Sequence, residues 1–186
     1  QLMSGVPAFS AKGITARVVG VVLGPTINLQ RTPLGGRNFE CYSEDPWLSG
    51  ELACAFVAGV QGAGVGACLK HFVCNDSEFE RHTIDVRVDE RSLRELYLRP
   101  FEMAIRRVGP WSIMAAYNSV GCAPCTASDW LNTQLLKLQL GFEGFIISDW
   151  DGIDYLDDDY AEAAAISVNA GVDMFMVSTE WRTFIE

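Results

Sequence analysis

The sequence predicts an α/β fold, a partial (β/α)8 barrel of the TIM type in which parallel strands alternate with helices. Five short apolar runs, each about the length of a buried strand, recur along the 186 residues. Segments with helical spacing of apolar side chains separate these runs, and such alternation indicates parallel β-α-β units. Because a complete barrel takes about 250 residues, we expect the chain to hold only part of one.

An open doubly wound sheet also fits this length. However, no G-x-G-x-x-G turn follows any of the five apolar runs, and that turn marks the dinucleotide-binding form of the doubly wound fold. The partial barrel is therefore the favoured interpretation. No linker or low-complexity stretch divides the chain, so we expect residues 1–186 to form a single domain, part of a barrel.

The first third of the chain predicts two strands with a loop and a helix between them. Residues 17–25 (RVVGVVLGP) read as a strand that ends at Gly-Pro, and residues 26–44 form a long loop. Asp45 is a suitable N-cap for a helix that begins at Pro46. We expect the inward face of this helix to carry Leu48, Leu52, Phe56 and Val60. The second strand spans residues 66–72.

The most regular helical pattern spans residues 89–108. Acidic residues stand at its start and basic residues at its end, which matches the helix dipole. Pro100 within it predicts a kink, because proline lacks the N–H that an interior helix position needs. The predicted apolar stripe consists of Leu93, Leu96, Tyr97, Pro100, Phe101, Ala104, Ile105 and Val108.

Three strands and two helices are predicted in the remainder. Residues 112–117 (SIMAAY) form a strand, and Ser128 caps the helix that follows. We expect this helix to face inward with Leu131, Leu135 and Leu138. Residues 144–150 (GFIISDW) form the next strand. A helix over residues 159–170 and a strand over residues 172–177 complete the pattern.

Composition narrows the possible partners. Hydrophobic residues make up 49% of the chain and charged residues 20%, which is typical of a folded domain with a real core. The net charge of −10 argues against nucleic acid or an anionic membrane as a partner. No apolar run approaches the length of a membrane span.

The six cysteines favour a reducing compartment, and so the cytoplasm over secretion. Cys54 and Cys68 lie in apolar segments and are expected to be small buried side chains. Cys122 and Cys125 have the spacing of a metal or redox pair, but no second such pair follows. A loop is therefore the favoured interpretation of this motif.

Polar residues follow the predicted strands at the points where the strands end. Four of them end strands and two stand in loops just beyond: Lys70, His71, Tyr117 and Asp149, then Arg37 and Arg81. Each alone has a structural explanation, as a surface lysine, a packed histidine or a packed aromatic. As a set they gather at one edge of a parallel sheet, where barrel enzymes hold their active sites. The cations would keep a single carboxylate ionised, which a carboxylate nucleophile requires.

Asp149 itself allows two interpretations. It follows four residues of apolar character and precedes Trp150, whose indole would form a flat wall beside a sugar ring. Asp is also a preferred N-cap, so the residue would equally serve to start the next helix. This segment alone does not decide between the two.

Several short motifs together resemble glycoside hydrolase family 3, in its β-glucosidase-like branch. They are GPT at 24–26, PLGGR at 33–37, YSEDP at 42–46, KHF at 70–72, ND at 75–76, GFEG at 141–144 and SDW at 148–150. Their order and spacing match that family over most of the chain. Residues 72–76 (FVCND) do not resemble the His-containing loop of the N-acetylglucosaminide branch, so a glucoside is favoured.

The resemblance implies an N-terminal barrel whose site binds the terminal glucose of a β-glucoside or cello-oligosaccharide. Asp149 falls on the position of the catalytic nucleophile in a retaining mechanism. Arg37, Lys70, His71 and Arg81 fall on positions that bind sugar hydroxyls, Met114 and Tyr117 on residues that line the same subsite, and Trp150 on the flanking aromatic. No metal and no cofactor are implied. The acid/base glutamate is expected in a C-terminal domain that this chain does not include.

Alternatives remain at this stage. A chain without its proton donor would act only as a catalytically incomplete, sugar-binding fragment. A lysine at the end of a barrel strand forms a Schiff base in aldolase-type chemistry, and Lys70 would be that residue. This interpretation leaves Arg37, Arg81 and Asp149 without a role. The acidic run at Asp151 and 157–159 is best explained as a solvated loop rather than a metal site.

Overall fold

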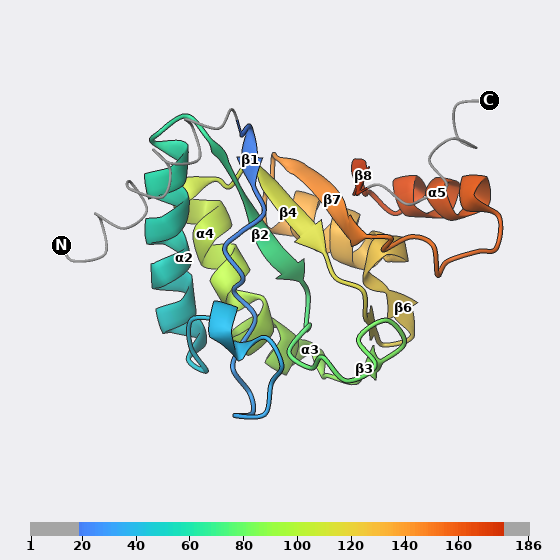
Figure 1. Ribbon diagram of the computed structural model, residues 1–186, viewed down its shortest axis with the longest axis horizontal. Helices are drawn as coiled ribbons and strands as arrows, with labels where there is room; N and C mark the ends of the chain where they lie inside the picture. Colours follow the sequence, from blue (N-terminus) through green and yellow to red (C-terminus); the bar gives the residue numbers. More distant parts are fainter. Residues whose placement is uncertain (1–18, 177–186) are drawn as a thin grey trace.

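The computed structural model describes residues 19–176, and its centre is a five-stranded parallel sheet (Figure 1). The strands are β1 (Val21–Val22), β2 (Gly66–Phe72), β4 (Ser112–Ala115), β7 (Phe145–Trp150) and β8 (Met174–Met176). They lie side by side in chain order, as in a barrel, whereas a doubly wound sheet reverses its order. The predicted partial barrel is therefore confirmed. The ends predicted at residues 17, 18 and 177 lie outside the described residues.

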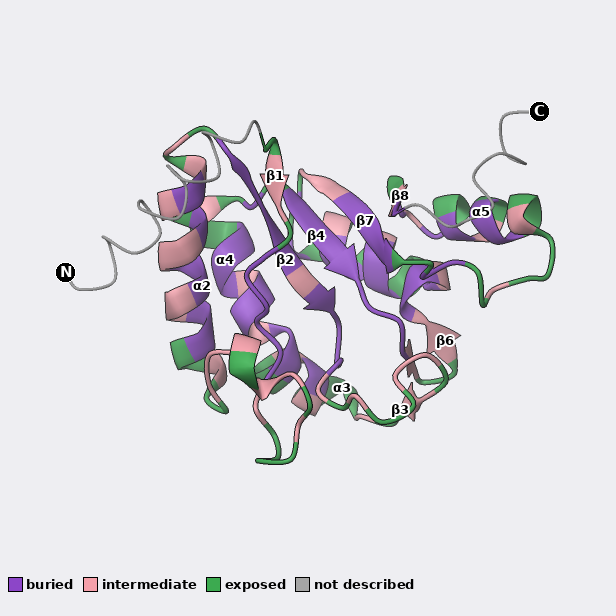
Figure 2. Cartoon of the chain, in the orientation of Figure 1, coloured by how far each residue is buried: buried purple, intermediate pink, exposed green. Residues whose placement is uncertain are grey.

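The middle three strands form the core of the domain. Nearly all residues of β2, β4 and β7 are buried, whereas the short β1 is half-buried (Figure 2). Helix α2 (Pro46–Gln61) packs against β2 and against α4 (Arg99–Val108). The ring of Phe72 on β2 meets that of Phe101 on α4 edge to face, with centroids 5.2 Å apart. All three central strands end at the same edge, which is the edge that carries the polar residues.

Helix α2 begins as predicted but presents a different face. The Asp45 carboxylate accepts hydrogen bonds from the N–H groups of Trp47 and Leu48, at 2.8 and 3.4 Å. Of the predicted inward residues only Val60 is buried, and Leu48 is 46% exposed. Mostly small residues face inward instead: Ser49, Gly50, Ala53, Cys54, Val57 and Val60. The reason is close packing, since a Cβ at residue 50 would lie 2.5 Å from the sulfur of Met103 on α4.

The helix predicted over residues 89–108 is interrupted, which confirms the effect expected of Pro100. It consists of α3 (Glu90–Ser92), a π-helical turn η2 (Leu93–Tyr97) and α4. The N–H of Leu98 bonds to the carbonyl of Leu93 at 2.8 Å, a five-residue step. The predicted stripe is largely buried. Its exception is Leu96, which the altered winding leaves 42% exposed.

The helix after Ser128 is also wound differently from the prediction. Ser128 does cap it, since its hydroxyl accepts from the N–H of Leu131 at 3.3 Å. The segment η4 (Trp130–Gln139) is π-helical, so backbone N–H groups bond to the carbonyl groups five residues earlier in the chain. This spacing brings Leu136 inward and leaves Leu138 67% exposed, so the prediction for Leu138 was wrong. Helix α5 (Tyr160–Asn169) follows the predicted bounds closely, and Asp159 caps it.

A small second sheet was not predicted. It joins β3 (Asp85–Val86) to β5 (Ser119–Val120) in parallel and β5 to β6 (Ala123–Pro124) in an antiparallel hairpin. Strands of two residues are too short to show periodicity. Cys122 lies in the turn of this hairpin, and the buried Cys125 begins the short 3-10 turn η3 (Cys125–Ala127) that follows it. The motif therefore lies in a connection between the larger elements, and all six cysteines are free. Within the described part of the chain, no helix combines the length and apolar character that crossing a membrane needs.

Candidate active site

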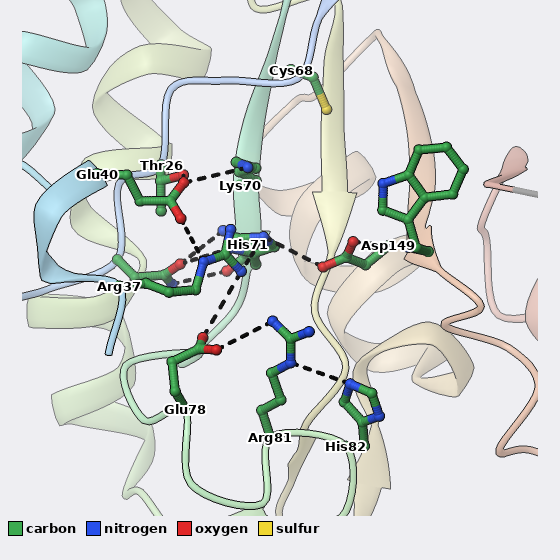
Figure 3. Close-up of polar contacts among 12 residues, drawn as sticks. Thr26, Arg37, Glu40, Cys68, Lys70, His71, Glu78, Arg81, His82 and Asp149 are labelled. Carbon is green, nitrogen blue, oxygen red and sulfur yellow. Dashed lines mark hydrogen bonds and ion pairs between the residues drawn. The ribbon is translucent and has the colours of Figure 1, made fainter. Parts of the chain in front are cut away.

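Pairing of the central strands places the predicted site residues at one rim. Strand β4 pairs with β2 on one side and with β7 on the other, with Ala115 opposite Ser148. His71 near the end of β2 and Asp149 near the end of β7 therefore converge beyond the end of β4. The loops after β1 and β2 bring Arg37 and Arg81 to the same rim (Figure 3).

A pocket of about 210 Å³ opens at this rim. Its lining contains all eight residues that the sequence predicted, together with one that it did not: Arg37, Lys70, His71, Arg81, Met114, Tyr117, Asp149, Trp150 and, in addition, Leu23. The volume suits one small polar molecule. A larger cavity of about 450 Å³, around Trp111 and Phe142, lies at the opposite ends of β4 and β7, away from these polar groups.

His71 is buried and neutral. Burial, together with the charges of Arg37 and Lys70, holds the pKa of His71 well below its usual value. Its Nε2 lies 3.1 Å from Nη1 of Arg37, which only donates, so Nε2 is the acceptor and the proton resides on Nδ1. Nδ1 faces Oδ1 of Asn28 at 3.4 Å. Asn28 also bonds the backbone N–H and carbonyl of His71, at 2.8 and 2.9 Å, which fixes the ring.

Asp149 is 6% exposed and is not a helix cap. Its Oδ1 accepts the N–H of Trp150 at 2.8 Å, and the next helix begins only at Tyr160, with Asp159 as its cap. Its Oδ2 lies 3.4 Å from Nε2 of His71. Because both atoms are acceptors in this state, a ligand hydroxyl that approaches the pair can donate its hydrogen to either atom.

Tyr117 completes the surroundings of the Asp149 carboxylate. Burial, and then the neighbouring negative charge of Asp149, raise the pKa of Tyr117 well above its usual value. The phenol therefore stays protonated and serves as a donor toward Asp149. Of the apolar lining residues, Met114 is buried, whereas Trp150 is 55% exposed.

Arg37 and Lys70 share one carboxylate, that of Glu40 in the short turn η1 (Asn38–Glu40). Oε1 of Glu40 accepts from Nε of Arg37 at 2.5 Å, and Oε2 lies 3.4 Å from Nζ of Lys70. Oε2 also accepts from the Thr26 hydroxyl. Burial opposes ionisation of Glu40. The hydrogen bonds from Arg37 and Thr26 and the charge of Lys70 outweigh it and lower the pKa of Glu40 to about 2.

Arg81 is held by three groups. Its Nη1 lies 3.2 Å from Oε2 of Glu78, and its guanidinium carbon lies 5.0 Å from the centre of the Tyr117 ring. Its Nε donates to Nε2 of His82 at 3.2 Å. The Nδ1 of His82 is then the protonated nitrogen and donates to the hydroxyl of Tyr155 at 2.7 Å.

Sequence reasoning missed the residues that stand behind the lining. They are Asn28, Glu40, Glu78, His82 and Tyr155. Charge spacing was a usable signal for two of them, since Glu40 follows Arg37 by three residues and Glu78 precedes Arg81 by three. Among residues 19–176, the structure has no group of three or more His, Cys, Asp or Glu side chains placed to hold a metal ion.

The chain is similar in sequence to several known proteins. A model of the glycosyl hydrolase family 3 N terminal domain matches residues 3–186. Thermostable beta-glucosidase B of Acetivibrio thermocellus is 46% identical over 153 residues, which are 82% of this chain and 20% of that protein. An exo-alpha-(1->6)-L-arabinopyranosidase of Bifidobacterium breve is 43% identical over 158 residues, covering 85% of this chain and 20% of that protein.

A solved structure gives the same fold. Beta-glucosidase 3B from Thermotoga neapolitana, in complex with glucose, matches with a TM-score of 0.89 and 44% sequence identity, covering 100% of this chain and 25% of that one. The chain thus spans about a fifth to a quarter of the length of the proteins it matches.

Proposed function

The chain belongs to glycosyl hydrolase family 3, and on that premise we propose that it supplies the sugar site and the nucleophile of a retaining β-glucosidase. The substrate would be a terminal non-reducing β-D-glucosyl residue of a β-glucoside or cello-oligosaccharide. The observation that carries this proposal is the 210 Å³ pocket, in which the buried carboxylate of Asp149 faces three cations and a neutral histidine.

In the proposed reaction, Oδ2 of Asp149 attacks the anomeric carbon of the sugar. A carbon–oxygen bond to the enzyme forms as the bond to the leaving group breaks, through an oxocarbenium-like transition state. Water then attacks the same carbon and releases both the sugar and the carboxylate. The leaving group takes its proton from a carboxylic acid that we place outside this chain, about 5–5.5 Å from the nucleophile.

The other lining residues would bind the sugar. Arg37, Lys70 and Arg81 donate hydrogen bonds to hydroxyl oxygens, and Nε2 of His71 accepts one. A site that pairs each hydroxyl rejects a sugar that lacks one, because a buried polar group is then left unpaired. Trp150 offers an exposed apolar face beside the carboxylate, suited to the ring of the sugar or of its leaving group.

Residues 1–186 would form an internal part of the barrel domain of a longer enzyme. The proposal requires a further domain to supply the acid, in agreement with the greater length of the relatives. A chain without that domain would bind sugar and form the covalent intermediate only with a very good leaving group. The alternative Schiff-base role of Lys70 is disfavoured because Nζ pairs with Glu40 at 3.4 Å, whereas that chemistry needs an unpaired, neutral amine.

An activated 2-deoxy-2-fluoroglucoside tests the nucleophile. It should form a stable ester on the peptide that contains Asp149, and D149N should remain unlabelled. Labelling of another carboxylate would contradict the proposal. In parallel, 4-nitrophenyl and 2,4-dinitrophenyl glucosides test the proton donor. Turnover of only the second would identify an intact nucleophile without its acid, because the better leaving group needs little protonation.

The same assay separates two sugars. An arabinopyranosidase is among the relatives, so 4-nitrophenyl β-D-glucopyranoside should be compared with the corresponding α-L-arabinopyranoside. The proposal expects the higher kcat/KM on the glucoside.

A further inference from the structure

Charge in the pocket is arranged in two layers. The lining contains three cations (Arg37, Lys70 and Arg81) but only one carboxylate, Asp149. Two further carboxylates, Glu40 and Glu78, lie behind the cations and outside the lining (Figure 3). The inner layer alone is strongly positive, whereas the two layers together hold three positive and three negative charges.

Glu40 is the more connected of the two outer carboxylates. Its two oxygens reach Thr26 and Arg37 in the segment after β1, and Lys70 on β2. Thr26 in turn pairs with Lys70 through a backbone bridge beside β2. The side chain of Glu40 is only 23% exposed, so solvent screens these interactions much less than on an open surface. With a pKa of about 2, Glu40 keeps its charge at neutral and mildly acidic pH.

We propose that Glu40 is a positioning and specificity-determining residue. It holds Arg37 and Lys70 in place and cancels part of their charge, so that the pocket takes a neutral sugar rather than an anionic one such as a uronate. The inference rests on the proposed function. A hydrogen bond from Arg or Lys to a neutral hydroxyl depends mainly on how the donor is placed. The attraction of a sugar carboxylate depends mainly on the net positive charge of the pocket. Glu40 preserves the first of these interactions and suppresses the second.

The test compares glucose with glucuronate, as competitive inhibitors of 4-nitrophenyl glucoside hydrolysis, in the full-length protein that carries this chain. In E40Q the affinity for glucose should fall about tenfold, because Arg37 and Lys70 lose their shared anchor. The affinity for glucuronate should hold or rise. The ratio of the two inhibition constants should therefore shift at least tenfold toward glucuronate.

Two matched variants sharpen the result. E51Q makes the same chemical change at the distant pair between Glu51 and Arg107, and it should alter neither constant. E40Q/K70M removes one anion and one cation together, so the preference for glucose over glucuronate should return toward that of the wild type. If Glu40 had a purely structural role, E40Q would weaken the binding of both sugars equally. That outcome, or an unchanged ratio, would overturn the inference.

Folding and the wider proposal are controlled separately. If E40Q fails to fold, E40D takes its place, because it keeps the negative charge on a side chain that is one methylene shorter. E40D should lower the affinity for glucose about tenfold without changing the ratio of the two inhibition constants. Wild-type affinity in E40D would overturn the positioning role. Should the wild type hydrolyse no glucoside, the proposed function fails. Calorimetric binding of glucose and glucuronate to the same variants then still tests Glu40.

Discussion

Nε2 of His71 lies 3.4 Å from Oδ2 of Asp149, although the two residues come from strands that are not neighbours in the sheet. Strand β4 lies between their strands, and it ends early enough for the two side chains to meet above it. Arg37 approaches the same nitrogen from the other side, at 3.1 Å. The imidazole is thus held in one tautomer next to the carboxylate that the proposed reaction uses.

This arrangement predicts a histidine that stays neutral in mild acid. Burial, and then Arg37 and Lys70, lower the pKa of His71 well below its usual 6.5. The ¹⁵N NMR signals of its ring should show a neutral imidazole protonated at Nδ1 from pH 8 down to pH 6. Because the folded-state pKa is depressed, the stability linked to His71 is present above pH 6.5 and is lost as the pH falls below it. A titration midpoint at or above 6.5 would contradict this prediction.

Asp76 should make stability depend on pH in the opposite direction to His71. Its Oδ1 accepts the N–H of Leu29 at 2.8 Å, but burial raises its pKa from 3.8 to about 6. The folded protein therefore binds the proton more tightly than the unfolded chain. The linked stability is complete below pH 4 and is lost as the pH rises through 6, by up to about 3 kcal/mol at 1.36 kcal/mol per unit.

The variant D76N isolates this effect, because its amide oxygen keeps the bond to Leu29 without the charge. In urea unfolding, D76N should match the wild type at pH 4 and exceed it by up to about 3 kcal/mol at pH 7. The difference between the two proteins cancels the titration of other groups. A difference that is the same at both pH values would count against a raised pKa for Asp76.

Arg81 should not be replaceable by lysine. Its guanidinium bonds Glu78 and His82 and stacks on Tyr117, and a single ammonium cannot reach all three. Because these contacts fix the guanidinium beside the pocket, we expect R81K to lose about tenfold in kcat/KM on a glucoside, which corresponds to about 1.4 kcal/mol. R91K, at the exposed pair with Glu95, is the control and should retain full activity. Equal activity of R81K and the wild type would contradict a role for Arg81 in the sugar site.

Gly50 should resist even a methyl group. A Cβ there would lie 2.5 Å from Sδ and 3.3 Å from Cβ of Met103. Overpacking of this kind costs about 1–3 kcal/mol, whereas alanine gains about 1 kcal/mol in helix propensity. We therefore expect G50A to lose on the order of 1 kcal/mol in urea unfolding. G20A, where nothing lies within 4 Å, serves as the comparison and should not be destabilised.

The predictable and unpredictable parts of the helices differ for a physical reason. Caps such as Asp45 and Ser128 act on groups two or three residues away, so local sequence was enough to find them. The inward faces of α2 and η4 depend on the neighbouring element and on the winding. Gly50 turns inward because Met103 is its neighbour, and Leu136 replaces Leu138 because the helix is π-wound.

By itself, the sequence determined the alternation of strands and helices and the polar residues at the strand ends, because both follow from patterns within a few neighbouring residues. These patterns, together with the resemblance to a known family, led to eight predicted residues that all line the pocket. Only the tertiary structure decided which groups stand behind that lining. Asn28 lies 43 residues from His71, and Glu40 lies 30 residues from Lys70. Such pairs depend on how the segment after β1 packs against strand β2, which no local pattern encodes.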